Sequence, residues 1–233
     1  MKKYLVPAIF TLLIIGIVIF VVRAASSSSN DAKPAESSTA SAALTDEQKA
    51  RLKEGQKKGA SDAKVVVTEF ADFQCPACKT FAPTLDEILK ENEGKVLIVF
   101  KHFPLYPQPH QNALVSAYAS EAAAKQGKFW EMYTILYEKQ DDWAELEDPK
   151  PKFVEYAKSL GLNEDGFRRD LDAEAGKDVI NADKDFASEL KLKGTPSIFV
   201  NGEEYSLRDG GAAGLKARVK ELVAQEYGQS TPQ

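Results

Sequence analysis

The pattern of hydrophobic and polar positions divides the chain into three parts. Residues 4–22 form an apolar run of nineteen positions without a charge, close to the ~20 residues that a helix needs to cross a bilayer. Residues 24–44 carry mostly small and polar side chains, which is typical of a flexible linker. Residues 45–230 alternate between strand-like and helix-like patterns, and we expect them to form one folded domain.

We interpret residues 1–23 as an N-terminal transmembrane signal-anchor. Lys2 and Lys3 precede the apolar run and only Arg23 follows it closely, so the positive-inside rule keeps the N-terminus in the cytoplasm and exports the rest. A cleaved signal peptide is the alternative, because small residues follow from Ala24. Length favours the anchor, since the apolar region of a signal usually has roughly 7 to 15 residues. Both interpretations place the domain outside the cytoplasm, and the anchor makes the chain a single-pass protein of the cell membrane.

Two short runs of β-branched and aromatic residues predict buried strands at residues 65–70 and 96–100. Between them, Phe81, Leu85 and Ile88 recur at helical spacing. The order strand, helix, strand predicts a parallel pair joined by a right-handed crossover. The domain therefore begins as an α/β sheet.

The flanking segments extend this α/β pattern. A capping box at residues 45–48 predicts a helix over about 46–58. Mostly helical patterns fill residues 107–193, which we expect to be a helical insertion.

The C-terminal part of the domain carries a hairpin signal. Two short strand patterns at residues 197–200 and 203–205 are joined by Asn201-Gly202, which favours a type I′ turn. A helix over about 213–227 then closes the domain.

Composition narrows the possible functions. The net charge of -5 and the pI near 5.3 give no basic surface of the kind that binds a phosphate backbone, so we expect no nucleic-acid partner. The chain has 2 cysteines, Cys75 and Cys78. They are three positions apart and cannot build a long-range disulfide framework.

The spacing of the two cysteines favours thiol-disulfide exchange. Cys75 lies at the predicted N-terminus of a helix, where free amide groups and the helix dipole stabilise a thiolate. Pro76 suits the first helical position because its missing N–H needs no partner there. Cys78 falls on the same helical face, one turn further in, where it can close a disulfide and is less reactive.

The two cysteines could also have three other roles. A structural zinc site could draw only on the two cysteines with His102 and His110, and seven residues separate the histidines where three to five are usual. A purely structural disulfide across three positions removes little entropy from the unfolded chain. Incidental buried thiols would pair in an oxidising compartment. We expect no metal site and no cofactor beyond the Cys75–Cys78 disulfide, and we assign both histidines to capping or loop packing.

Several motifs resemble the DsbA-like branch of the thioredoxin superfamily over roughly residues 59–227. They are VTEFADFQCPAC at residues 67–78, KHFPL at 101–105, GKFWEM at 127–132 and GTP at 194–196. A lone CxxC is common, but this ordered set is specific. The resemblance implies a thioredoxin fold with a helical insertion, which the N-terminal transmembrane helix precedes.

The resemblance also implies site residues. Thr195 and Pro196 match the cis-proline loop beside the dithiol, where, with Pro76 and Ala77, they contact the substrate peptide. Glu69 matches a buried acid that moves the proton of Cys78.

Some of these assignments have simpler alternatives. Lys101 is a second catalytic candidate and could pair with Glu69. Either side chain could instead point to solvent at a strand end, and Pro196 could merely begin a strand. The apolar stripe Met132, Tyr133, Leu136 and Tyr137 is expected to be core rather than a peptide groove.

The sequence therefore predicts an extracytoplasmic dithiol oxidase that forms disulfides in exported proteins. The resemblance implies that a membrane partner of DsbB or vitamin-K-epoxide-reductase type reoxidises it. A reductase or isomerase on the same fold is the alternative, and a non-catalytic peptide-binding chaperone is a third. Ala77 stands where well-known members carry a histidine, and the missing cation leaves the oxidising strength open.

Overall fold

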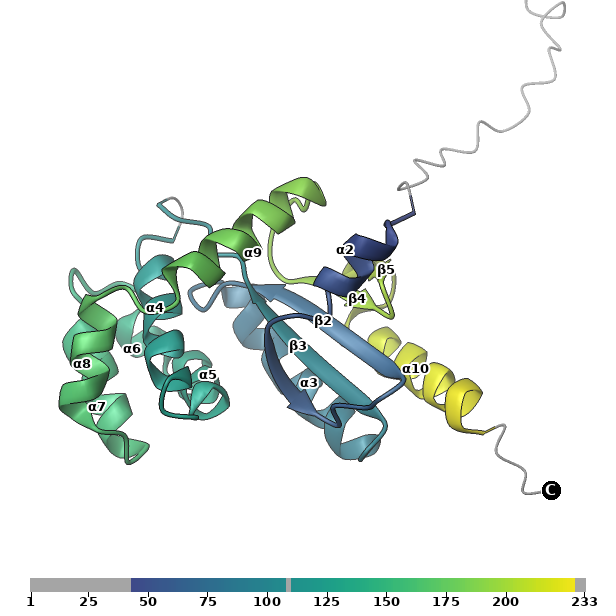
Figure 1. The fold of residues 1–233 in the computed structure, drawn as a ribbon, viewed down its shortest axis with the longest axis horizontal. Coiled ribbons are helices and arrows are strands. Elements are labelled where there is room, and N and C mark those ends of the chain that lie inside the picture. Colours follow the sequence, from purple (N-terminus) through teal and green to yellow (C-terminus); the bar gives the residue numbers. More distant parts are fainter. Residues whose placement is uncertain (1–42, 108–109, 229–233) are drawn as a thin grey trace, which may run out of the picture. The chain divides into compact units, whose positions relative to one another are not determined.

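Five strands form one mixed sheet in the computed structural model, which describes residues 43–107 and 110–228 (Figure 1). The strand order is β1-β3-β2-β4-β5. The strands are β1 (Gln56–Gly59), β2 (Val65–Ala71), β3 (Val96–His102), β4 (Ser197–Val200) and β5 (Glu203–Tyr205). As predicted, β2 and β3 are parallel, and the other neighbouring pairs are antiparallel.

The predicted membrane segment cannot be compared with this structure. Residues 4–22 lie outside the described residues, as does the linker expected over 24–44 except for Ala43 and Leu44. Within the described ranges, no helix combines the length and the apolar character that crossing a bilayer requires.

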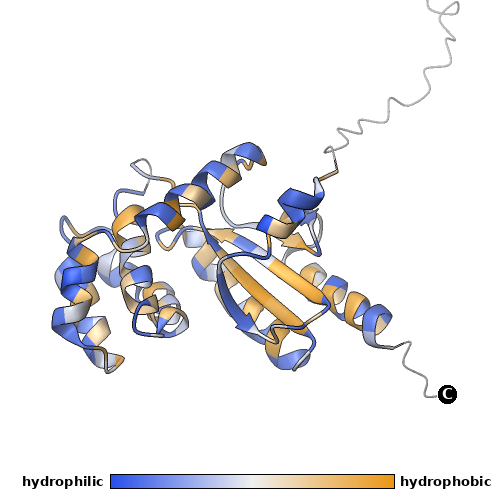
Figure 2. Ribbon diagram, in the orientation of Figure 1, coloured by the Kyte–Doolittle hydropathy of each residue, from blue (hydrophilic) through white to orange (hydrophobic). Residues whose placement is uncertain are grey.

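Helices cover both faces of the sheet. On one face, α3 (Pro76–Glu91) and α10 (Leu207–Tyr227) pack with Val67 of β2 and Ile98 of β3 in one hydrophobic cluster. On the other face, Phe70 of β2 packs with residues of α9 (Lys177–Glu189). Figure 2 shows the result as apolar central strands β2 and β3 beside a hydrophilic β1. Because β2 and β3 are buried along their whole length, they hold the chain segments that follow them in fixed positions.

The helix predicted over residues 46–58 is wrong in its second half. The capping box does form, with the Thr45 hydroxyl accepting from the amide of Gln48, but α2 (Asp46–Arg51) is short. Residues Gln56–Gly59 instead pair with β3 as an edge strand. Gly55 and Gly59 explain the difference: both have positive φ, and a Cβ at either would collide with a backbone carbonyl of β3.

The helical insertion lies between β3 and β4, as predicted. Its helices are α4 (Ala113–Ala124), α5 (Phe129–Glu138), α6 (Gln140–Trp143), α7 (Lys150–Ser159), α8 (Glu164–Asp172) and α9. Met132, Leu136 and Trp143 are fully buried in one cluster that also contains Cys75 and Cys78. The stripe on α5 is therefore core, and it packs directly against the dithiol.

The C-terminal hairpin has the predicted turn. Asn201 and Gly202 both have positive φ, at 50° and 84°, as a type I′ turn requires. The last helix starts at Leu207, earlier than predicted, but Gly211 interrupts it with φ 55° and ψ -154°. The continuous helix thus begins close to the expected residue 213.

Candidate active site

The two cysteines lie where β2 ends and α3 begins. Cys75 is the N-cap residue of α3, Pro76 follows at its start, and the amide of Cys75 donates to the carbonyl of Asp72 at 3.0 Å. Cys78 is fully buried one turn inside the helix, and both cysteines are free thiols. The sequence prediction for the placement of the pair is confirmed.

The loop before β4 contacts the dithiol. The Thr195–Pro196 peptide bond is cis, and the thiol of Cys75 donates to the carbonyl oxygen of Thr195 at 3.5 Å. Pro76 and Ala77 are exposed, and Thr195 and Pro196 are half-buried. The four residues predicted to contact substrate therefore surround Cys75.

The environments of the two cysteines shift their thiol pKa values in opposite directions. The pKa of Cys75 is lowered to about 5, chiefly because the thiol of Cys78 donates a hydrogen bond to its thiolate, with further donation from Thr195 and the backbone amides of Ala77 and Cys78. Burial opposes this effect. The pKa of Cys78 is raised well above its usual range, mainly by burial. These shifts favour Cys75 over Cys78 as the reactive thiolate and leaving group.

A buried carboxylate interacts electrostatically with both thiols. Glu69 on β2 has no exposed surface, so the alternative that it points to solvent is wrong. Its Oε2 accepts a hydrogen bond from the Tyr133 hydroxyl at 3.3 Å, and its Oε1 has no partner among the described residues. Burial raises the pKa of Glu69 to about 8, against the lowering effect of Tyr133. At neutral pH the group therefore carries a proton in most molecules.

The expected pairing of Lys101 with Glu69 is wrong. Lys101 is buried and its Nζ lies 2.7 Å from Oδ1 of Asp183 on α9. In the β2–β3 register Lys101 is opposite Phe70, and Glu69 is opposite Phe100. Because side chains alternate between the faces of a sheet, Lys101 and Glu69 lie on opposite faces. The structure does not bring Lys101 to the dithiol.

Asp72 organises the turn before Cys75. Its Oδ1 accepts from the amide of Gln74 at 2.8 Å, and its Oδ2 accepts from the amide of Leu105 at 2.9 Å and contacts Nδ1 of His110 at 2.6 Å. His102 instead contacts Oε1 of Glu121 through Nε2 at 2.9 Å. His110 thus packs in a loop, as predicted, whereas His102 lies in the buried end of β3 and not in the capping or loop position expected for it.

Gln140 is a site residue that the sequence analysis missed. Its buried Nε2 donates to the carbonyl oxygens of Phe73 at 2.7 Å and Cys75 at 3.1 Å. The amide thereby ties the helical insertion to the backbone of the nucleophile. The sequence signal that could have identified Gln140 is its position four residues after Leu136, where a polar side chain continues an apolar helical stripe.

Comparison with known proteins agrees with this geometry. A family model described as thioredoxin matches residues 51–217. The probable disulfide bond formation protein D of Bacillus cereus is 36% identical over 156 residues, covering 63% of this chain and 70% of that protein. The crystal structure of oxidised BdbD from Bacillus subtilis superposes with a TM-score of 0.62 at 27% identity, covering 73% of this chain and 91% of that one.

A second group of relatives is much longer than this chain. The Na(+)/H(+) antiporter NhaA 1 of Mycolicibacterium vanbaalenii is 36% identical over 149 residues, or 62% of this chain. The match spans only 23% of the antiporter's length, so the likeness concerns one part of that protein. The family model covers well over half of the chain, and the cis-proline contact and the helical insertion accompany the dithiol. The chain therefore belongs to the thioredoxin family, in its DsbA-like branch.

Proposed function

We propose that the chain is a dithiol oxidase that forms disulfide bonds in exported proteins. The observation that carries the proposal is the position of Cys75 at the N-cap of α3 beside the cis Thr195–Pro196 loop, a setting that lowers its pKa to about 5. Every interaction that stabilises the Cys75 thiolate stabilises the reduced enzyme, and hence makes the enzyme's own disulfide more oxidising. The effect is present although Ala77 supplies no cation, because hydrogen bonds from Cys78, Thr195 and the backbone take its place.

The reaction begins from the Cys75–Cys78 disulfide. A substrate thiolate attacks Sγ of Cys75, a mixed disulfide forms, and Cys78 leaves as a thiolate that takes the proton of Glu69. A second substrate thiolate then attacks the substrate sulfur of the mixed disulfide, and Cys75 leaves as a stable thiolate. The substrate loses two electrons to the enzyme, and its two thiol protons go to solvent and to Glu69.

The surroundings of Cys75 support a peptide substrate. Pro76 and Ala77 are exposed on one side of the thiol, and the Thr195–Pro196 loop flanks it on the other. An extended peptide can pair with the backbone of Thr195 as an added strand, which accepts many sequences because main-chain groups make the contacts.

We place this activity outside the cytoplasm. The apolar run at residues 4–22 with Lys2 and Lys3 before it favours export with a membrane anchor. The two electrons collected by the dithiol must leave, and a quinone-linked membrane protein of DsbB or vitamin-K-epoxide-reductase type is the acceptor that the resemblance implies.

The redox potential of the Cys75/Cys78 pair tests the proposal. We expect equilibration with glutathione to give a potential well above that of thioredoxin, about -270 mV, together with a Cys75 thiolate that persists in mildly acidic buffer by ultraviolet absorbance. A thioredoxin-like potential with an ordinary thiol pKa would favour a reductase and contradict the oxidase.

Single cysteine variants test the exchange chemistry itself. Cys78→Ser should trap mixed disulfides at Cys75, whereas Cys75→Ser should trap none because Cys78 is buried and its pKa is raised. Full activity of Cys75→Ser in a disulfide-dependent reporter would instead support a chaperone.

A further inference from the structure

We infer that the cleft between α3 and α5 is the proton exit of the active site: the proton of Cys78 passes to Glu69, then through the Tyr133 hydroxyl to water in the cleft. The inference deepens the exchange function proposed above and rests on it. It assigns Tyr133 as a relay residue and gives the cleft a role in catalysis.

The cleft has a volume of about 330 Å³ and lies between the two helices. Its lining combines apolar and aromatic side chains with charged groups: Lys79, Ala82, Pro83, Asp86, Tyr133, Thr134, Tyr137 and Glu138. Pro83 has no N–H to donate to the carbonyl of Lys79 one turn earlier in α3. The cleft therefore offers polar groups to water, and Tyr133 is part of its lining.

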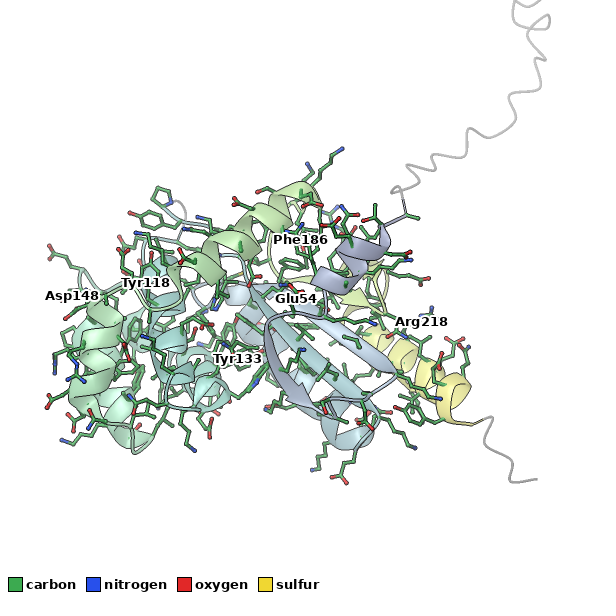
Figure 3. The ribbon with its side chains drawn as sticks, in the orientation of Figure 1. Glu54, Tyr118, Tyr133, Asp148, Phe186 and Arg218 are labelled. Atoms are coloured by element: carbon green, nitrogen blue, oxygen red, sulfur yellow. The ribbon has the colours of Figure 1, made fainter. Side chains whose placement is uncertain are left out.

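Tyr133 connects this cleft to the buried acid. It lines the cleft, and its hydroxyl donates to Oε2 of Glu69 at 3.3 Å. Figure 3 labels Tyr133 where the helical insertion meets the sheet. A tyrosine in an otherwise apolar stripe needs a partner for its hydroxyl, and here that partner is the group that must exchange a proton with Cys78.

Apolar side chains flank Glu69 and Tyr133. The ring centroids of Phe73 and Phe100 lie 5.9 and 5.6 Å from that of Tyr133, and Ile198 of β4 is the neighbour of Glu69 across the sheet. Lys101 could have held and released a proton, but it is paired with Asp183 on the opposite face. Tyr133 is both a hydrogen-bond partner of Glu69 and a residue of the cleft lining, and the proposed route therefore runs through its hydroxyl.

Several titratable groups act on this pair, from every element packed around it. Cys75 and Cys78 face it from α3, and Tyr137 faces it from α5. Asp86 of α3 acts on Tyr133 from the cleft, where it is paired with Lys58. On the sheet, His102 packs against Phe100 and is paired with Glu121.

The proposed proton transfers balance, and Tyr133 keeps its net charge because it gains one proton as it loses another. When the reduced enzyme is reoxidised, Glu69 first gives up its own proton, and the Cys78 thiol then loses its proton to the Glu69 carboxylate, so that the S–H bond breaks as an O–H bond forms. The protonated Glu69 then donates to the hydroxyl oxygen of Tyr133 while the Tyr133 O–H proton passes to a water molecule in the cleft. During substrate oxidation the same steps run in reverse and return a proton to Glu69.

Tyr137 provides a matched control. It lies one helical turn after Tyr133 on α5, is equally buried, and lines the same cleft. Its hydroxyl donates to the backbone carbonyl of Asp72 at 3.3 Å and not to Glu69. Tyr133→Phe and Tyr137→Phe therefore each remove one buried hydroxyl from the same helix, but only Tyr133→Phe removes a hydrogen-bond partner of Glu69.

The experiment follows the rate at which Cys78 closes a mixed disulfide between Cys75 and a small thiol. We expect Tyr133→Phe to slow this step by about tenfold, at the low end of general acid–base effects, and Tyr137→Phe to change it by less than about twofold. Imidazole added as a proton carrier should restore the Tyr133→Phe rate. In a Glu69→Gln background Tyr133→Phe should add no further slowing. Equal rates for both phenylalanine variants, or slowing that imidazole does not relieve, would overturn the relay.

A second variant tests the cleft without touching the hydroxyl. Thr134 is half-buried on α5 and lines the cleft, so Thr134→Leu should fill it, slow the same step several-fold, and leave the protein folded. A wild-type rate for Thr134→Leu would overturn the cleft as the exit. These outcomes are separate from the proposed function, because trapping at Cys75 in Cys78→Ser and the redox potential do not depend on how fast the proton leaves.

Discussion

The thiol of Cys75 lies 3.5 Å from the carbonyl oxygen of Thr195, although the two residues are 120 positions apart in the chain. The sheet creates this contact, because β2 leads into Cys75 and the antiparallel neighbour β4 begins directly after Pro196. The Oγ1 of Thr195 is buried and has no hydrogen-bond partner among the described residues. It is therefore free to donate to a Cys75 thiolate.

Removing the Thr195 hydroxyl should weaken the nucleophile. We expect Thr195→Val to raise the pKa of Cys75, because a hydrogen bond from Thr195 is one of the effects that lower it. The thiolate fraction in mildly acidic buffer should fall, and the redox potential should become less oxidising. Ultraviolet absorbance of the thiolate during a pH titration measures the change. Thr195→Ser, which keeps the hydroxyl, should retain the wild-type titration, and a shift in that variant would contradict the explanation.

The stability of the reduced protein should depend on pH more steeply than that of the oxidised protein. The folded pKa of Cys75 is lowered from 9.0 to about 5, so its contribution to stability is fully present only above pH 9. That contribution is lost progressively as the pH falls through about 5. The disulfide form has no thiol to titrate, so urea unfolding of both forms across this range isolates the effect. If the free energies of unfolding of the two forms changed in parallel with pH, Cys75 would not be the source of the pH dependence.

Glu69→Gln should stabilise the protein at neutral and alkaline pH while it slows exchange. The folded pKa of Glu69 is raised from 4.5 to about 8. The corresponding stability is present below pH 4.5 and is lost as the pH rises towards and through 8. Replacing the carboxylate should therefore raise the free energy of unfolding above neutral pH by about 1–3 kcal/mol. Denaturant unfolding at pH 5 and pH 9 checks the sign, since the gain should be larger at the higher pH.

The sequence was sufficient for the central elements of the fold because their signals are local. The runs at residues 65–70 and 96–100, the Asn201-Gly202 turn and the cysteine spacing each encode their own conformation. β1 was missed because it owes its strand conformation to pairing with β3, and Gly55 and Gly59 report only a close approach to an unknown neighbour. A capping box specifies where a helix starts and not where it ends.

The site residues were likewise predictable where the signal is local. Cys75, Cys78 and the Thr195–Pro196 loop carry motifs, whereas the partners of Glu69 and Lys101 depend on which face each occupies. A strand buried on both faces has no polar alternation that would reveal this. Tyr133 and Gln140 lie in apolar helical stripes. The hydrogen-bond partners of their polar atoms are determined only when α5 and α6 pack against the start of α3.

Gln140→Leu should loosen the active-site turn. The carbonyl oxygen of Phe73 would lose its buried donor while that of Cys75 keeps the amide of Lys79, and one buried polar atom without a partner costs about 1–3 kcal/mol. We expect lower stability in urea and a raised pKa of Cys75, because the turn no longer holds the backbone amides against the thiolate. Gln126→Leu is the control: this glutamine also donates to a carbonyl, that of Asn163 at 3.2 Å, but outside the site. It should leave the pKa of Cys75 unchanged.

Lys101 and Asp183 should matter for stability and not for exchange. Asp183→Ala leaves the buried ammonium of Lys101 without a counter-charge and the amide of His102 without an acceptor, and breaking such a pair costs about 3–5 kcal/mol. Combining Lys101→Met with Asp183→Asn should recover much of this loss, because no charge remains buried and the asparagine oxygen can still accept from His102.

The same double variant decides the role of Lys101. The pair lies on the sheet face opposite Glu69, so the titration of Cys75 and the pH profile of mixed-disulfide closure should match those of the wild-type protein. Urea unfolding and thiolate absorbance on one preparation supply both measurements. A displaced pH profile in a variant of normal stability would mean that Lys101 acts on the proton of Cys78 after all, through the sheet and not through a direct contact with Glu69.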